Sequence, residues 1–290
     1  MSADALGAAS ASAPPSRCVD LHAHSTASDG ARSPTAAVAG AHAAGLAAFA
    51  LTDHDTLAGV PEAQRAADAV GLRLVPGVEM SVHQDASEVH LLGLHIRDVA
   101  AMQDALELYR DRRRSRAVEI VAKLTALGVP IPLEAVLGAA AGGAIGRPHV
   151  ATALIGAGHV KDSREAFDRF LAAGRPAYVE KERLEIGEGI ALIHRAGGIA
   201  VIAHPGGEGR RERIEPLIAL GLDGLEVRHP GHSAEDTKRI AALAEFFGLV
   251  PSGGSDWHGA MQGTRVLGAM RVPEAWIDAQ DARVAMRRAG

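Results

Sequence analysis

Short apolar runs alternate with segments of helical periodicity along most of the chain. Apolar runs that predict strands lie at 19–21, 47–52, 72–82, 89–95, 199–203, 224–227, 249–253 and 266–272. Segments that predict helices between or after these strands lie at 34–44, 61–70, 186–196, 212–220, 233–247 and 278–288. This alternation is typical of an α/β protein with a mainly parallel sheet or barrel.

The alternation stops near residue 98. A long helical stretch is expected over 99–127, and shorter helices follow at 133–140, 148–157 and 163–173. We therefore expect one barrel domain, formed by 17–98 and 177–290, and a helical insertion domain over 99–176. Residues 1–16 are rich in Ala, Ser and Pro and lack a basic start and a sustained apolar stretch, which predicts a flexible tail rather than a signal peptide.

Composition narrows the class of protein. The 290 residues are 47% hydrophobic but only 3% aromatic, so a sizeable core has to be built from Ala, Val, Leu and Ile. A net charge of −5 argues against a basic protein that coats nucleic acid. No apolar run approaches the roughly 20 residues of a membrane span. The lone Cys18 cannot form an intramolecular disulfide; we expect a cytoplasmic protein in which Cys18 is a buried structural thiol, a nucleophilic thiol being the alternative.

Histidines and carboxylates recur where the predicted strands end. His22 and His24 lie two residues apart, so both point to the same face of a strand. The carboxyl ends of parallel strands meet at one edge, which brings together residues far apart in sequence. The candidate metal ligands chosen on this basis are His22, His24, Asp29, His54, Glu79, His90, His204, Asp256 and His258.

This set of side chains predicts a cluster of metal ions rather than a single one. Imidazole with carboxylate, and without thiolate, suits manganese, iron or zinc and disfavours a structural zinc site. There are too many candidates for one ion, but they could serve three divalent ions with Glu79 as a bridge. The ions would outweigh the charge of the carboxylates and attract an anionic phosphate, which favours phosphoester hydrolysis.

Several motifs resemble those of one known family. They are His22-Ala-His24, Thr52-Asp-His54-Asp55, Gly77-Val-Glu79, Ala203-His204-Pro205 and Gly254-Ser-Asp256-Trp-His258-Gly259. In this order they resemble the PHP (polymerase and histidinol phosphatase) superfamily, from about Arg17 to at least Gly268. The resemblance implies a distorted (β/α)7 barrel with a trinuclear metal site. We expect three divalent ions there, manganese first, with iron or zinc as alternatives.

The resemblance also implies how the ligands are divided. One ion would be held by His22, His24, Glu79 and Asp256, a second by Glu79, His90 and His204, and a third by Asp29, His54 and His258. Asp53 and Asp55 flank a ligand, and we expect them to support His54 or to cap the following helix rather than to bind metal.

Within the superfamily, the insertion is most similar to that of the 3′,5′-nucleoside bisphosphate phosphatases, which include enzymes described as RNase AM. The similarity rests on Gly146-Arg147-Pro148-His149 and on the segment 225–233. It implies removal of a 3′-phosphate by metal-bound hydroxide, which leaves a 5′-nucleotide, and 5′-to-3′ shortening of short RNA as a further activity. The expected partners are a nucleotide or short RNA, with no membrane and no obligate protein partner.

Substrate contacts are expected at three residues. Arg147 can hold a phosphate with two hydrogen bonds near a helix N-terminus, with His149 beside it, although both could instead form a helix-start motif packed between the domains. His229 would contact phosphate or protonate the leaving oxygen, unless it lies in a surface loop.

Two other questions stay open at the level of the sequence. The basic run Arg110, Arg112, Arg113, Arg114 and Arg116 predicts a solvated helix face by default and an RNA-steering patch as the alternative. The competing functions are a histidinol-phosphate-type monoester phosphatase, a non-catalytic PHP domain that binds metal, and an amide or lactone hydrolase. A second phosphate clamp counts against the first of these, and the full set of ligands counts against the second.

Overall fold

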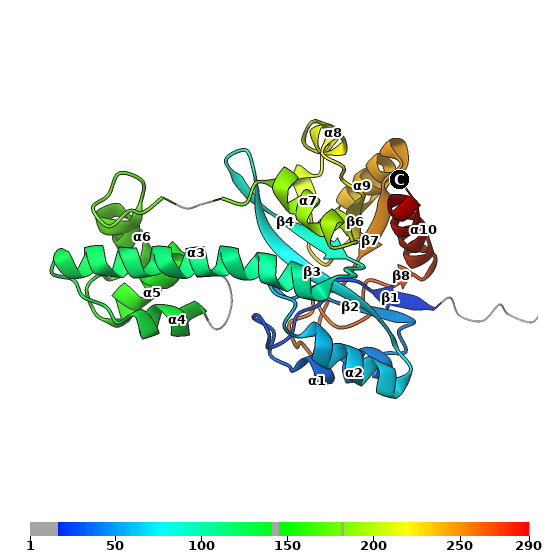
Figure 1. Ribbon diagram of the computed structural model, residues 1–290, viewed down its shortest axis with the longest axis horizontal. Helices are drawn as coiled ribbons and strands as arrows, with labels where there is room; N and C mark the ends of the chain where they lie inside the picture. The colour runs from blue at the N-terminus through cyan, green and yellow to red at the C-terminus, as the bar shows by residue number, and fades with distance from the viewer. Residues whose placement is uncertain (1–16, 141–144, 181–182, 290) are drawn as a thin grey trace, which may run out of the picture.

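The computed structural model describes residues 17–140, 145–180 and 183–289, so the expected tail at 1–16 lies outside the described residues. One eight-stranded sheet curls on itself in the order β7-β6-β5-β4-β3-β2-β1-β8 (Figure 1). Where the sheet nearly closes, the Leu21 amide donates to the Gly253 carbonyl at 3.1 Å. A distorted α/β barrel is confirmed.

The strands are β1 Cys18–Asp20, β2 Ala48–Leu51, β3 Arg73–Gln84, β4 Ser87–Leu94, β5 Ile199–Ile202, β6 Gly224–Arg228, β7 Val250–Gly253 and β8 Val272–Pro273. The α-helices are α1 Pro34–Ala43, α2 Val60–Val70, α3 Val99–Ala126, α4 Leu133–Ala140, α5 Arg147–Gly156, α6 Ser163–Ala166, α7 Ile186–Arg195, α8 Arg211–Ala219, α9 Ala234–Phe247 and α10 Ala275–Ala289. Two other helical turns are a π-helix at Phe167–Leu171 and a 3₁₀-helix at Gly206–Glu208.

The sheet departs from the expected mainly parallel order at β4. β1, β2 and β3 are parallel to one another, as are β5, β6 and β7, but β4 is antiparallel to both β3 and β5. The reason is local: Gln84 pairs with Ser87, and Asp85 between them has a φ of 56°, so the chain reverses too tightly for a crossover helix.

The strand expected over 266–272 is wrong in length. Only Val272–Pro273 pairs with β1, in antiparallel register. The preceding segment turns repeatedly because Gly263, Gly268 and Arg271 all have positive φ angles, of 94°, 77° and 47°. A strand cannot continue through such residues.

Two hydrophobic layers fix the barrel. Inside it, buried residues of β1, β4 and β5 such as Val19, Leu92 and Val201 pack together. Outside it, Met80 and Leu91 of the β3–β4 hairpin pack against α7 and α8. Since side chains alternate across a strand, these two layers also determine which residues of β3 and β4 face the barrel interior.

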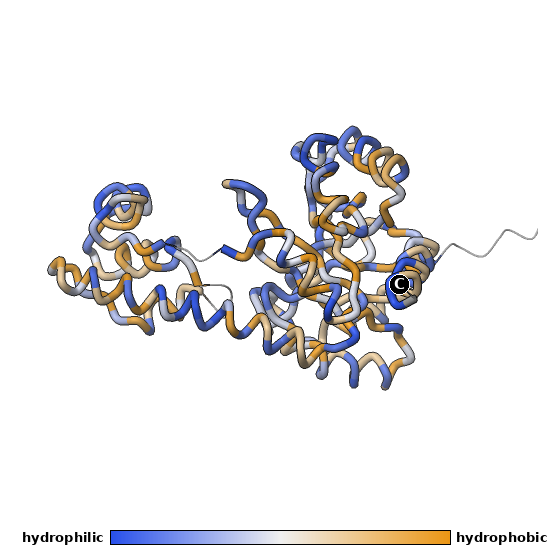
Figure 2. The backbone as a smooth tube through the Cα atoms, turned by 45° about the horizontal axis from the view of Figure 1, so that its top comes forward, coloured by the Kyte–Doolittle hydropathy of each residue, from blue (hydrophilic) through white to orange (hydrophobic). Residues whose placement is uncertain are grey.

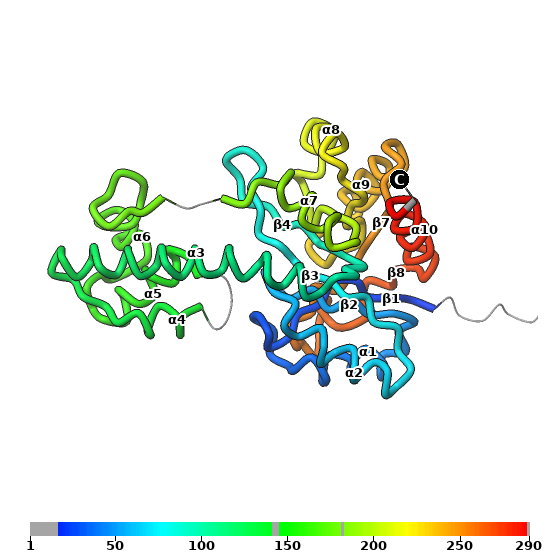
Figure 3. Tube along the Cα trace, in the orientation of Figure 1, coloured from blue at the N-terminus to red at the C-terminus, as the bar shows by residue number. Residues whose placement is uncertain are grey.

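The long helix α3 contributes to two separate hydrophobic clusters. Its first part places Met102 and Leu106 in the outer barrel cluster, whereas Ile120 and Leu124 pack with α4, α5 and α6 in the insertion. Figure 2 shows a hydrophilic stretch of α3 between these parts, and Figure 3 shows the trace leaving the barrel along this helix. The division of the chain at residue 99 stays a prediction, but α3 itself is shared by both bodies.

Asp223 ties the C-terminal helix to the barrel. Its fully buried carboxylate accepts hydrogen bonds from the Ala200 amide at 2.9 Å, from His194 Nε2 at 2.8 Å and from Arg287 Nε at 2.5 Å. Burial by itself would raise the pKa of Asp223, but these three donors outweigh it and hold the pKa below its ordinary value. These three contacts therefore join α7, β5 and α10 around one buried charge.

We expect Asp223→Asn to lower the free energy of unfolding by about 2–3 kcal/mol near neutral pH, because it leaves charged donors without their carboxylate. A carboxyl with a lowered pKa stabilises the fold above its unfolded pKa and loses this contribution as pH falls through its folded pKa. The difference from wild type should therefore shrink below about pH 4 in urea unfolding. The exposed Asp278 of α10 supplies the control, Asp278→Asn; equal losses in both variants would contradict this account.

In the part of the chain that the structure describes, every helix is too short or too polar to cross a lipid bilayer.

Candidate metal centre

The predicted ligands converge at one lip of the barrel. His22 and His24 follow β1, and His54 follows β2. His204 follows β5, and the segment with Asp256 and His258 follows β7. These positions are the expected carboxyl ends of parallel strands.

Glu79 and His90 reach the same lip differently, so their expected place at strand ends is wrong. Glu79 lies inside β3, and His90 lies in the first half of β4, opposite Ser81. Since β4 runs antiparallel to its neighbours, its amino-terminal half lies beside the carboxyl ends of the parallel strands. The hairpin extends past the lip and brings both side chains to the cluster.

Glu79 is the centre of the cluster. One carboxylate oxygen, Oε2, lies 3.1 Å from His22 Nε2, 3.2 Å from His24 Nε2 and 3.3 Å from His54 Nδ1. The other oxygen, Oε1, lies 2.8 Å from His90 Nδ1 and 2.9 Å from His204 Nε2. Its side chain is only 1% exposed, so five imidazoles surround one buried charge.

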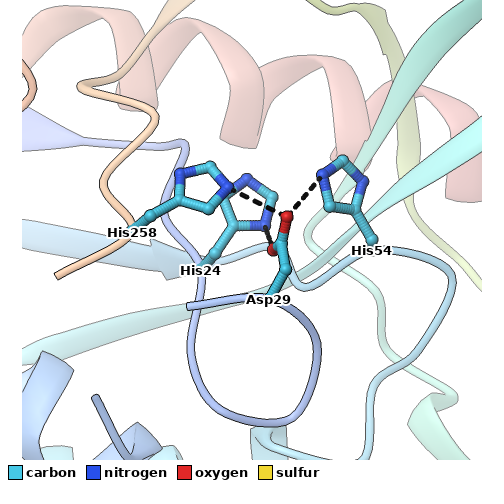
Figure 4. A group of neighbouring side chains, drawn as sticks. All are labelled: His24, Asp29, His54 and His258. Atoms are coloured by element: carbon cyan, nitrogen blue, oxygen red, sulfur yellow. Dashed lines mark ion pairs between the residues drawn. The ribbon is translucent and has the colours of Figure 1, made fainter. Parts of the chain in front are cut away.

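Asp29 is the centre of a second, more exposed group. Its carboxylate lies between three imidazoles, with contacts of 3.7 Å to His24, 3.8 Å to His54 and 3.3 Å to His258 (Figure 4). The ring centroids of His24 and His258 are stacked 4.2 Å apart. His24 therefore contacts both Glu79 and Asp29.

The ligand atoms fall into three groups that could each hold an ion. They are His22, His24, Glu79 and Asp256; His24, Asp29, His54 and His258; and His54, Glu79 and His90. The first group is the same as the expected first ligand set. The second group is the expected third set, Asp29, His54 and His258, with His24 added. The third group has His54 where His204 was expected, and His204 lies against the same Glu79 oxygen as His90.

Buried, unpaired nitrogen atoms fit bound cations. His22 Nε2 and both ring nitrogens of His24 are buried and make no hydrogen bond. Burial lowers the pKa of these imidazoles, but the carboxylates beside them reverse the effect: the pKa of His22 is well above its ordinary value, and that of His24 is raised to about 9. The cluster thus favours positive charge at these positions, and a divalent ion can replace the protons. The donor set suits manganese, iron or zinc.

Glu226 supports the cluster and was missed in the sequence. This fully buried carboxylate contacts His22 Nδ1 through Oε1 at 3.0 Å and accepts the His204 amide through Oε2 at 2.6 Å. A carboxylate on the outer nitrogen of a metal-binding imidazole fixes its tautomer and orientation. Its position in the apolar run 224–227 could have revealed it, because a charged residue is seldom buried unless it has a partner.

Asp53 and Asp55 support the cluster from either side of His54. Asp53 accepts hydrogen bonds from the Ser25 amide and hydroxyl and from the Ser28 hydroxyl, all at 2.7 Å. These contacts hold the loop that carries Asp29. Asp55 accepts the Ser81 amide at 2.9 Å.

His229 contacts a predicted ligand. Its Nε2 lies 3.3 Å from Asp256 Oδ2, and its Nδ1 accepts the Gly231 amide at 3.0 Å. Because Nδ1 is an acceptor, the neutral ring carries its proton on Nε2, directed at Asp256. Arg265 also donates to Asp256 Oδ2, from the loop before β8.

Arg147 and His149 lie at the start of α5 in the insertion. Arg147 Nη1 donates to the Leu171 carbonyl at 3.0 Å, and its guanidinium carbon lies 5.3 Å from the centroid of the Tyr178 ring. His149 Nδ1 accepts the Gly146 amide at 3.0 Å, which caps the helix. Both residues therefore have a structural role in the insertion, and the substrate role expected of them stays a prediction.

The basic run of α3 is not a uniformly solvated face. Arg113 is only 14% exposed and lies 3.0 Å from Asp55 Oδ2, while Arg116 donates to the Val179 carbonyl at 2.8 and 3.0 Å. The default expectation was wrong for these two residues because α3 is held at both ends by hydrophobic clusters, which turns this part of the helix inward. Arg114 is exposed, as expected.

Comparisons with known proteins find relatives along most of the chain. A model of the PHP domain matches residues 20–121. A 5′-3′ exoribonuclease of Haemophilus influenzae is 40% identical, over 82% of this chain and 89% of that protein. A 3′,5′-nucleoside bisphosphate phosphatase of Chromobacterium violaceum is 38% identical, over 86% of this chain and 90% of that protein.

A solved structure from Bifidobacterium adolescentis, described as that of a candidate metal-dependent phosphoesterase, is 32% identical and covers 93% of this chain and 98% of its own, with a TM-score of 0.70. Relatives along most of the chain and a carboxylate–imidazole cluster at the barrel lip lead to one assignment: the chain belongs to the PHP family of metal-dependent phosphoesterases.

Proposed function

We propose that the protein removes the 3′-phosphate of nucleoside 3′,5′-bisphosphates and releases 5′-nucleotides. One observation carries the proposal: starting from Arg113 beside the predicted metal cluster, three arginines lie close enough to repel one another and could hold a second phosphate. Arg113 contacts Asp55 beside the cluster, and Arg116 and Arg147 lie farther along the insertion. The Chromobacterium violaceum relative bears the name of this activity.

The arginines favour an anion because they repel one another. Burial lowers the pKa of Arg116, and the charges of Arg147 and Arg113 lower it further. A phosphate among these guanidinium groups would relieve the repulsion and accept several charge-assisted hydrogen bonds. A substrate with two phosphates can therefore place one at the metal cluster and the other at Arg147.

The cluster would hold three divalent ions, which we propose to be manganese. Bound ions would supply Lewis acidity toward the 3′-phosphate. Glu79 and Asp29 balance their charge, and Glu226 keeps the Nε2 lone pair of His22 available. His229 directs its Nε2 proton at Asp256 and so orients this carboxylate. From the same position, His229 would contact the phosphate or the leaving oxygen.

Shortening of RNA from its 5′ end is a second candidate activity. The inward-facing arginines suit a 5′-phosphorylated end, and the Haemophilus influenzae relative is named an exoribonuclease. Few aromatic side chains are available to stack on bases, so recognition would rest on phosphate rather than on sequence. A cytoplasmic compartment stays a prediction.

A substrate panel with added Mn²⁺ tests the assignment. It should contain 3′,5′-bisphosphoadenosine, 3′-AMP, histidinol phosphate, a 5′-phosphorylated dinucleotide, and amide and lactone substrates. We expect kcat/KM for the bisphosphate to exceed that for 3′-AMP by at least about tenfold, because a charged hydrogen bond contributes about 1.5–3 kcal/mol. Preference for histidinol phosphate would contradict the proposal, and a dinucleotide cleaved as fast as the bisphosphate would reassign the protein as a nuclease.

Arg147→Met should remove this preference. We expect its KM for the bisphosphate to rise about 10–100-fold, with kcat/KM for 3′-AMP nearly unchanged, because only the second phosphate needs the guanidinium. Arg164→Met in α6 is the matched control, since the Arg164 side chain is 90% exposed. An equal loss on both substrates would assign Arg147 to the packing of the insertion instead.

A further inference from the structure

We propose that Arg113 is a positioning residue that fixes the loop after β2 through Asp55, and so holds His54 in place for the ion shared with His24, Asp29 and His258. The inference rests on the metal binding of the proposed function, but not on the identity of the substrate. It assigns the insertion a role in building the metal site, besides that of binding substrate.

The backbone at Asp55 needs support. This residue has a φ of 51°, in the left-handed region that non-glycine residues seldom occupy. Its amide donates to the Glu79 carbonyl at 2.9 Å, and Oδ1 accepts the Ser81 amide at 2.9 Å. The chain directly after His54 is thus held against β3 by two hydrogen bonds, in a sparsely populated backbone conformation.

The remaining oxygen of Asp55 lies beside a charged side chain. Oδ2 is buried and makes no hydrogen bond of good geometry, yet it lies 3.0 Å from Arg113 Nη1. The two side chains are only 8% and 14% exposed, so water screens their attraction weakly. Without Arg113, the buried Asp55 carboxylate would lose its counter-charge. The same carboxylate holds the loop after His54 against β3 through its other oxygen.

The position of Arg113 is set from outside the metal site. It lies on α3 between Leu106, which packs in the barrel, and Ala117, which packs in the insertion. Arg116, one turn later, is bonded to the Val179 carbonyl on the returning chain. The helix is therefore fixed at both sides of Arg113, and the guanidinium reaches Asp55 from a rigid support rather than from a loop.

Metal titration of the full chain tests the proposal without relying on turnover. After removal of metal with a chelator, isothermal titration with Mn²⁺ should show at least one ion bound about 10–100-fold more weakly in Arg113→Met than in wild type, with at least one other ion unchanged. Arg113→Lys should recover part of this loss. Arg114→Met, on the exposed side of the same helix, should match wild type.

A second set of variants keeps the test decisive. Asp55→Asn, which tolerates a positive φ, should weaken the same ion, and Arg113→Met should add no further loss in a His54→Ala background. An unchanged Mn²⁺ isotherm for Arg113→Met, or equal weakening of every ion, overturns the proposal. A wild type that prefers histidinol phosphate would refute the assigned substrate and leave this result standing.

Discussion

Replacement of Glu79 with glutamine is expected to lower kcat/KM by more than about 100-fold and to remove at least one bound Mn²⁺, since even residues that only support metal ligands contribute 10–100-fold. Both oxygens of Glu79 are engaged: Oε2 faces His22, His24 and His54, and Oε1 faces two further imidazoles. Glutamine keeps the shape but loses the charge, and it directs an amide NH₂ at one of the groups.

The measurement is metal content per chain together with steady-state turnover of 3′,5′-bisphosphoadenosine. Glu88→Gln is a suitable control, because Glu88 lies on the same hairpin but is 47% exposed at the side chain. Circular dichroism should show that both variants fold. Full Mn²⁺ content in Glu79→Gln, with more than a tenth of wild-type turnover, would remove Glu79 from the centre of the site.

Glu226→Gln is expected to lower Mn²⁺ affinity and kcat/KM by about 10–100-fold, although Glu226 is not one of the proposed metal ligands. Both Glu226 oxygens accept hydrogen bonds, one from His22 Nδ1 and one from the His204 amide. In glutamine the oxygen can serve His204, but the NH₂ then faces His22 Nδ1. The ring must move its proton to Nε2, and this proton blocks the lone pair that an ion needs.

Isothermal titration with Mn²⁺ measures this effect directly, and chemical unfolding of the metal-free protein separates it from stability. Glu235→Gln, at an exposed carboxylate on α9, is the control. If Glu226→Gln bound Mn²⁺ as tightly as wild type while unfolding more readily, the carboxylate would have only a packing role.

Several residues at the barrel lip were predictable because they follow closely after an apolar run. His22, His54, His204 and Asp256 are polar side chains just past the point where a buried strand ends, and parallel strands place such points together. Glu226 and Asp20 were not predictable in the same way. They lie inside apolar runs, and their partners are far along the chain: Glu226 bonds to His22, and Asp20 accepts the Ser255 amide at 2.9 Å.

Strand direction and helix orientation could not be derived from periodicity. Apolar runs predict that 72–82 and 89–95 are strands, but such runs do not distinguish parallel from antiparallel pairs. The orientation of Arg113 depends on two hydrophobic clusters that hold α3, and each cluster includes residues from several other elements. Such long-range packing decides which face of a charged helix is buried.

The sharing of α3 limits how this protein can be cut or recombined. Removing 99–176 as though it were a self-contained graft would take Met102 and Leu106 out of the barrel, along with the hydrogen bond from Tyr109 to Glu188 on α7. A substrate-binding insertion from a relative could be exchanged only from the middle of α3 onward, in helical phase with the turns that stay behind. The first turns of α3 therefore cannot vary independently of the barrel, because their side chains belong to the barrel's outer hydrophobic cluster.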